Sequence, residues 1–153
     1  MNQSIYIDAN ILIGLFERDK DVKKLSNNTI RQAITMANNP EIKIKIPSIA
    51  LAEFTLWCIR QNCLEDVAAK FYKYLFDLKA DFPTPTKEHY KKAKTLMELD
   101  ERYESHDSLI VSHALLDSDT KWLLTTETDL HLDPNIEKEK NKLGNKFKIS
   151  DRF

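Results

Sequence analysis

The sequence predicts an α/β fold with a mainly parallel central sheet and helices on both faces of it. Short apolar runs rich in β-branched or aromatic residues occur at Ile5–Ile7, Ile42–Ile46 and Trp122–Thr125. Segments with helical spacing of apolar residues lie between them. Strands separated by helices favour parallel pairing with both sheet faces covered. In such sheets, ligands bind outside the carboxyl ends of the strands.

Length and composition predict a single domain. The chain has 153 residues, of which 42% are hydrophobic, enough for one core, so we expect one domain over residues 1–153. It has no run of 18 apolar residues and no signal-peptide pattern at its start, so we expect a cytoplasmic protein that does not enter a membrane. Cys58 and Cys63 lie in an apolar, helical-looking stretch and are expected to be reduced residues in or near the core.

Helices are predicted where apolar residues recur every three or four positions. The expected helices are Ile11–Phe16, Ile30–Ala37, Ser48–Arg60, Glu65–Leu78, Thr86–Leu99 and one that starts at Ser105. In the second strand, isoleucines alternate with lysines, which gives one wet face and predicts a position near a sheet edge. The polar tract Asp133–Asn145 is predicted to be a solvated excursion, and Phe147–Ile149 could add a last strand.

Several acidic residues fall at positions where a charge is costly. Asp8 ends the first predicted strand, and Glu53 lies among apolar neighbours in a predicted helix. Asp107 begins an apolar helix. Glu127 and Asp129 directly follow the third predicted strand. An unpaired buried carboxylate is strongly disfavoured or has a raised pKa. A divalent metal ion would offset both the burial and the mutual repulsion of such a group.

Each acid also has a structural interpretation. Asp8 and Asp107 could cap the helices that follow them. Glu53 has no helix end to cap, so a salt bridge to Lys or Arg is its main structural alternative. Glu127 and Asp129 could be ordinary turn residues. The hypothesis of a metal site therefore depends on the acids taken together.

Four segments, in order, resemble the motifs of PIN domains over nearly the whole chain. Ile5–Leu12 resembles the opening strand that delivers an Asp, followed two positions later by a small polar residue. Pro47–Phe54 is similar to the second motif, a helix carrying Glu. His106–Ala114 resembles the third, in which Asp opens the central helix. Leu123–Leu130 resembles the fourth, an apolar strand followed by Thr and closely spaced acids.

The resemblance implies a three-layer α/β/α PIN-like domain that acts as a metal-dependent endoribonuclease, of the VapC-like toxin type. Its implied cofactor is Mg²⁺ or Mn²⁺, which prefers oxygen ligands. The implied ligands are Asp8, Glu53, Asp107, Glu127 and Asp129, with Asn10 and Thr125 hydrogen-bonding beside them. The family usually has Asp where this chain has Glu127, so either Glu127 or Asp129 supplies the fourth carboxylate. The resemblance further implies an RNA substrate, a partner antitoxin and a homodimer.

Two other functions are compatible with the same residues. The first is a housekeeping RNA-processing PIN nuclease, which would have the same motifs. The second is an inactive PIN-like module that binds RNA or protein, and Glu127 in place of Asp is the one feature that favours it. Basic residues could bring RNA phosphates to the acidic pocket, and the candidates are Lys91, Lys92, Lys94, Arg102, Lys138, Lys140 and Lys142. His106 is interpreted as a helix-start residue rather than as a metal or acid–base residue.

Overall fold

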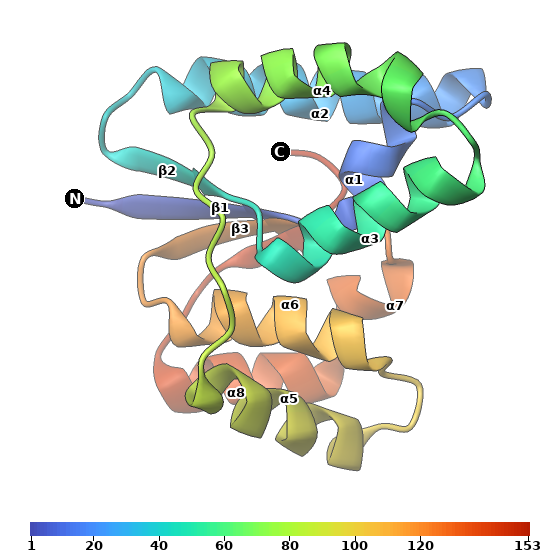
Figure 1. Ribbon diagram of the computed structural model, residues 1–153. Coiled ribbons are helices and arrows are strands. Elements are labelled where there is room, and N and C mark those ends of the chain that lie inside the picture. Colours follow the sequence, from blue (N-terminus) through green and yellow to red (C-terminus); the bar gives the residue numbers. More distant parts are fainter.

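The computed structural model describes residues 1–153 and has three layers (Figure 1). Its middle layer is a sheet of four strands, in the order β2-β1-β3-β4, in which every neighbouring pair is parallel. The strands are β1 (Gln3–Ile7), β2 (Ile42–Lys45), β3 (Thr120–Leu124) and β4 (Lys148–Ser150). The predicted α/β fold with a mainly parallel sheet is confirmed. β2 lies at one edge of the sheet, as its alternating pattern predicted.

Helices cover both faces of the sheet, which completes the α/β/α layering (Figure 1). On one side lie α1 (Ala9–Gly14), α2 (Lys20–Ala37) and α4 (Leu64–Leu78). On the other side lie α5 (Lys87–Leu99), α6 (Ser105–Leu116) and α8 (Pro134–Leu143). Two further helices follow the carboxyl ends of strands: α3 (Ser48–Arg60) comes after β2, and α7 (Thr128–His131) comes after β3. No helix is long and apolar enough to cross a membrane.

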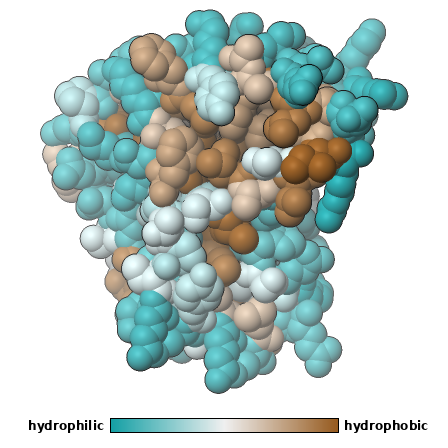
Figure 2. Space-filling view, in the orientation of Figure 1, coloured by the Kyte–Doolittle hydropathy of each residue, from teal (hydrophilic) through white to brown (hydrophobic).

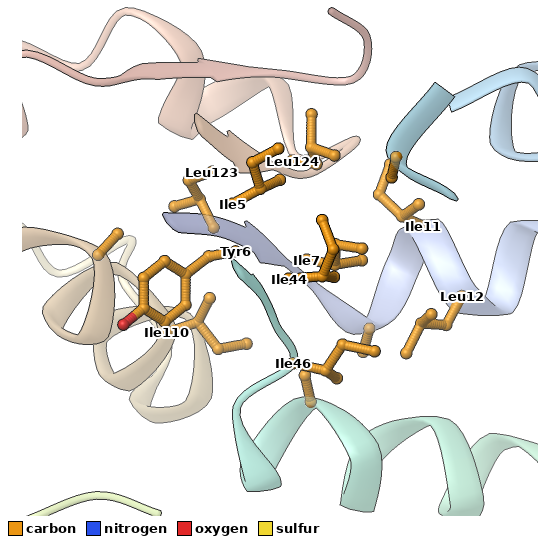
Figure 3. Packing of buried hydrophobic residues seen from close by; sticks show 14 of the residues in the cluster. Ile5, Tyr6, Ile7, Ile11, Leu12, Ile44, Ile46, Ile110, Leu123 and Leu124 are labelled. Atoms are coloured by element: carbon orange, nitrogen blue, oxygen red, sulfur yellow. The ribbon is translucent and has the colours of Figure 1, made fainter. Parts of the chain in front are cut away.

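The core forms on both faces of the sheet because successive side chains of a strand point to opposite faces. In β1, Ile7 lies on the side that faces Ile11 and Leu12 of α1, whereas Tyr6 lies on the side that faces Ile110 of α6 (Figure 3). All five residues are buried. From Ile5 to Ile7 the strand is therefore apolar on both faces, as expected of a central parallel strand.

The prediction of a solvated excursion for Asp133–Asn145 is wrong, because most of this tract is α8. Asp133 caps the helix by accepting hydrogen bonds from the backbone amides of residues 135 and 136, and Pro134 occupies the first turn. Gly144 ends the helix with a left-handed φ of 66°. Ile136 and the carboxylate-bearing Glu139 are buried, and Lys92 of α5 pairs with Glu139 at 3.0 Å. Tertiary packing thus orders a segment that is polar in composition.

Two helices begin before the first apolar residue of their predicted patterns. α2 begins at Lys20 rather than Ile30, because Asp19 accepts hydrogen bonds from the backbone amides of residues 21 and 22. α1 begins at Ala9, two residues before Ile11, and Asp8 separates it from β1. Both cysteines are free thiols, with Cys58 buried and Cys63 half-buried, as predicted.

Asn145 holds the end of α6. Its side-chain nitrogen Nδ2 donates to the backbone carbonyls of Ala114, Leu115 and Asp117 at 3.3, 3.2 and 2.9 Å. The last carbonyls of a helix have no partner within the helix, so an outside donor satisfies them. Asn145 is itself buried.

Asn145→Ala is therefore expected to lower the free energy of unfolding by about 1–2 kcal/mol, since it removes three hydrogen bonds at the end of α6 and takes from the Leu115 carbonyl the donor that Ala114 and Asp117 still find in Thr120. Urea denaturation followed by circular dichroism measures this change. Lys146→Ala, at the exposed neighbouring position, is the control and should change stability by less than about 0.5 kcal/mol. Equal effects of the two variants would show that Asn145 does not stabilise the α6 terminus.

One face of the molecule carries exposed apolar side chains. Figure 2 shows brown, apolar residues gathered on the face where α3 and α4 lie in Figure 1. Exposed residues of these two helices include Leu56, Ile59 and Phe76, the last with 82% of its surface accessible. An apolar area of this kind is typical of an interaction surface.

Candidate functional site

The site forms at the carboxyl ends of the two central strands. β1 pairs with β2 along one of its edges and with β3 along the other. The chain goes from β1 to β2 on one side and from β3 to β4 on the other. Connections therefore leave β1 and β3 in different directions, and a crevice forms between their carboxyl ends, where ligands bind in open α/β sheets. Asp8 directly follows β1, and Thr125 directly follows β3.

Asp8 is almost fully buried, with 2% of its surface exposed, and its carboxylate accepts hydrogen bonds from three groups. It is the N-cap residue of α1, and its Oδ1 accepts from the backbone amide of Ala9 at 2.7 Å. Its Oδ2 accepts from the Thr125 hydroxyl at 2.8 Å and lies 3.4 Å from the Asn10 amide nitrogen. The Asp8 side chain thus caps α1 and also bonds to the residue that follows β3.

Asn10 and Thr125 link the ends of β1 and β3. The Thr125 hydroxyl oxygen donates to Asp8 and accepts from Asn10 Nδ2 and from the Glu127 backbone amide, both at 3.1 Å. Asn10 Oδ1 in turn accepts from the backbone amide of Thr126 at 2.9 Å. These bonds fix the Asp8 carboxylate and the start of the loop after β3 relative to each other.

Glu53 projects from the middle of α3 and is half-buried. Its Oε1 is buried and has no hydrogen-bond partner, which is rare for a carboxylate oxygen. No Lys or Arg pairs with it, so the salt bridge that was its main structural alternative is absent. Its one partner among the basic side chains within 4 Å is His106, whose Nε2 lies 3.7 Å from Oε2.

Asp107 lies in the first turn of α6 and is half-buried. It lines a pocket of about 140 Å³ together with Glu127 and Asp129 from the segment after β3. Arg102 lines the same pocket and is held by Asp100 through contacts of 2.7–3.1 Å. The pocket is therefore acidic inside and has one guanidinium group in its lining.

Burial and mutual repulsion raise the pKa values of three of these acids. For Asp8 the main cause is burial, with a contribution from the charge of Glu127 that His106 opposes. Burial raises the pKa of Glu53 to about 7, and the charges of Asp8 and Asp107 add to the effect. Burial also raises the pKa of Asp107 to about 6, with further contributions from Asp8 and Glu127. The charges of Asp8, Asp107 and Glu127 thus act on neighbouring acids of the group, and Glu53 is acted on by Asp8 and Asp107, so these four residues from separate segments form one electrostatic cluster. Ligand atoms within 4.8 Å of one another, however, are found for Glu104, His106 and Asp107 and not for Asp8, Glu53 or Glu127.

Glu127 and Asp129 differ in their surroundings. Glu127 is half-buried, and its charge acts on both Asp8 and Asp107. Asp129 is exposed, and its charge acts on Arg102, where it adds to the effect of Asp100 in raising the pKa. Both residues line the pocket beside Asp107, but only the charge of Glu127 contributes to the raised pKa values of Asp8 and Asp107.

Glu127→Gln is accordingly expected to weaken Mn²⁺ binding by at least about tenfold, whereas Asp129→Asn should change it by less than about threefold. The reason is that the charge of Glu127, unlike that of Asp129, acts on Asp8 and Asp107. Isothermal titration calorimetry of the two variants provides the comparison. A larger loss for Asp129→Asn would assign the fourth position to Asp129 instead.

His106 lies among the acids, a position that the sequence interpretation did not anticipate. It is the second residue of α6, as expected of a helix-start residue, but its Nε2 lies 3.3 Å from Glu104 Oε2 and 3.4 Å from Asp107 Oδ1. Potential ligand atoms of Glu104, His106 and Asp107 all lie within 4.8 Å of one another. The pair His106-Asp107 in the first turn of a helix was the available signal, because two adjacent metal-binding residue types follow Glu104 there.

Most of the candidate basic residues are occupied by structural contacts. Lys92 and Lys142 pair with the buried Glu139 of α8. Lys140 is buried against the Phe147 ring and pairs with Glu137. Lys91 and Lys94 form ion pairs within α5, and Lys138 is exposed. Of the seven candidates, Arg102 is the one that lines the acidic pocket.

The donor set fits a hard divalent cation. Several carboxylates with raised pKa values and an unpartnered Glu53 oxygen are the chemistry that Mg²⁺ or Mn²⁺ would satisfy. No family model matches the chain, and no curated protein sequence matches it either. The function must therefore be inferred from the residues of the site.

Proposed function

We propose that this chain is a metal-dependent endoribonuclease that cleaves RNA phosphodiester bonds with Mg²⁺ or Mn²⁺. The observation that supports the proposal most is the electrostatic cluster of Asp8, Glu53, Asp107 and Glu127 at the carboxyl ends of β1 and β3. Such a cluster is unfavourable in the absence of a cation, because burial and neighbouring negative charges raise the cost of ionising Asp8, Glu53 and Asp107. A site that costs stability in this way is typical of function rather than of structure.

Asp8, Asp107, Glu53 and Glu127 would hold the metal. A bound dication would lower the pKa of the attacking water and neutralise negative charge on the phosphate oxygens. Asn10 and Thr125 keep the Asp8 carboxylate in place through their hydrogen bonds. Arg102 is positioned at the pocket to contact a phosphate of the substrate, although part of its charge is already shared with Asp100.

The choice of RNA, and of a VapC-like toxin paired with an antitoxin, comes from the resemblance of the four motifs to PIN domains. A cytoplasmic location belongs to the same proposal. The expected homodimer, or the antitoxin, would use the apolar face of α3 and α4, because exposed side chains such as Ile59 and Phe76 gain most from being covered.

The proposal is tested by incubating the purified chain with fluorescently labelled single-stranded RNA, with Mg²⁺, with Mn²⁺ or with EDTA. We expect fragments in the presence of either ion and none with EDTA. Cleavage that persists in EDTA would contradict a metal-dependent mechanism. RNA or protein binding without cleavage under either ion would favour the inactive PIN-like module instead.

A further inference from the structure

His106 lies among more carboxylates than any other basic group of the protein. Its Nε2 is 3.3 Å from Glu104 Oε2, 3.4 Å from Asp107 Oδ1 and 3.7 Å from Glu53 Oε2. The three carboxylates come from α3, from the start of α6 and from the residue that caps it. One imidazole nitrogen therefore faces acids from two helices at once.

These contacts lie beyond the usual range of hydrogen-bond distances. An N–H···O hydrogen bond has a donor–acceptor distance of about 2.7–3.2 Å. The distances from Nε2 to Glu104 and Asp107 are instead close to the spacing of about 3 Å between neighbouring ligand atoms around an ion with bonds of about 2.1 Å. The Glu53 side chain adds an independent sign, because its Oε1 is buried and has no partner while its Oε2 faces His106.

We propose that His106 is a ligand of the divalent ion, through Nε2 and together with Asp107 and Glu104, and that it makes the site select Mn²⁺ over Mg²⁺. This inference depends on the proposed metal site and assigns to it a ligand and a preference for one ion. His106 is a specificity-determining residue in this scheme, whereas the buried Asp8 and the half-buried Glu53 supply negative charge.

The preference follows from the chemistry of imidazole. Mg²⁺ is a hard ion that binds carboxylate, carbonyl and water oxygens, and it loses its waters reluctantly. Imidazole nitrogen is a softer ligand that suits transition metals. A donor set of carboxylates alone would accept both ions, so the addition of one imidazole shifts the preference towards Mn²⁺.

A different role for His106 would be that of a protonated partner that neutralises the carboxylates only while no metal is bound. In that case the ring would be displaced when the ion enters, and His106 would not be bonded to it. Direct detection of a nitrogen–manganese bond separates the two roles.

The decisive experiment is electron spin echo envelope modulation of the full chain loaded with one equivalent of Mn²⁺. We expect modulation from a directly bonded ¹⁴N nucleus, and we expect it to disappear in His106→Gln, which keeps the other three histidines. A Mn²⁺ signal without nitrogen modulation in the unchanged protein would overturn the proposal, as would nitrogen modulation that persists in His106→Gln.

Calorimetric titration with each ion gives a second readout. His106→Gln replaces the imidazole by an amide oxygen, so Mn²⁺ affinity should fall by at least about tenfold while Mg²⁺ affinity changes by less than about threefold. Equal losses for the two ions would contradict the selectivity. Thermal unfolding without metal checks that the variant is folded.

Failure of this inference can be told apart from failure of the proposed function. If Asp107→Asn abolishes Mn²⁺ binding while the unchanged protein shows no nitrogen modulation, the carboxylate site stands and the role of His106 is refuted. If the unchanged protein binds neither ion, both proposals are refuted.

Discussion

Asp107→Asn is expected to reduce RNA cleavage by at least about a hundredfold, the size of loss seen when one preorganised charged group is removed from an active site. The substitution removes a carboxylate that lines the acidic pocket and interacts electrostatically with Asp8 and Glu127. It should leave the fold intact, because Asp107 is only half-buried and asparagine has nearly the same shape.

Initial rates of RNA cleavage at saturating Mn²⁺ measure this loss, with circular dichroism as the check on folding. Asp66→Asn is a matched control, because Asp66 also lies in the first turn of a helix, α4, and is exposed. The control should keep its rate within about twofold. Full activity of Asp107→Asn would place the catalytic site elsewhere, and we expect Asp8→Asn to behave as Asp107→Asn does.

Glu53→Gln is expected to stabilise the metal-free protein while abolishing high-affinity metal binding. Glu53 has a pKa of about 7 in the folded protein and 4.5 when unperturbed. Below pH 4.5 the side chain is protonated in both the folded and the unfolded state, so the substitution has little effect there. Between these values the folded protein retains a proton that the unfolded chain has lost, so the stability of the unchanged protein falls as the pH rises.

Above pH 7 the gain in the free energy of unfolding that Glu53→Gln gives reaches its limit, which is on the order of 1–2 kcal/mol because solvent screens the half-exposed side chain. Coupling to Asp107 spreads part of the effect over both groups. Urea unfolding of both proteins in EDTA across this pH range measures the difference. Glu98→Gln, an exposed carboxylate of α5 that pairs with Lys94, should show no such pH dependence. A Glu53→Gln variant less stable than the unchanged protein above pH 7 would mean that Glu53 stabilises the fold.

The strands and most helices could be predicted because their signals are local. β1 is apolar on both faces, β2 alternates, and α6 is apolar nearly all round, and each pattern follows from the layer in which the element lies. Asp8 and Asp107 were recognisable for a related reason, since each stands at the end of such an element. The spacing of apolar residues fixes which positions face the core.

α8 was missed because its stability comes from contacts distant in sequence. Its tract contains many lysines and glutamates, yet Ile136 enters the core and Glu139 pairs with Lys92 of α5. Asp133, Pro134 and Gly144 were usable signals for its ends, because they occupy the positions that those residue types prefer at helix termini.

The arrangement within the site was also beyond the sequence. The local sequence does not distinguish Glu127 from Asp129. The two differ because the charge of Glu127, and not that of Asp129, acts on Asp8 in the folded protein. The position of His106 beside Glu53 depends on the packing of α3 against α6, which brings together residues far apart in the chain. Spacing along the chain carries no information about such a contact.

The most direct test of the metal site is an anomalous difference map from a crystal of the protein soaked in Mn²⁺. We predict a strong peak within about 2–2.5 Å of carboxylate oxygens of this cluster, with Asp107 among its ligands and Asp8 and Glu53 beside it. Ordered density for these side chains with no peak between them, or peaks only at surface carboxylates elsewhere, would contradict the assignment of this cluster as a metal site.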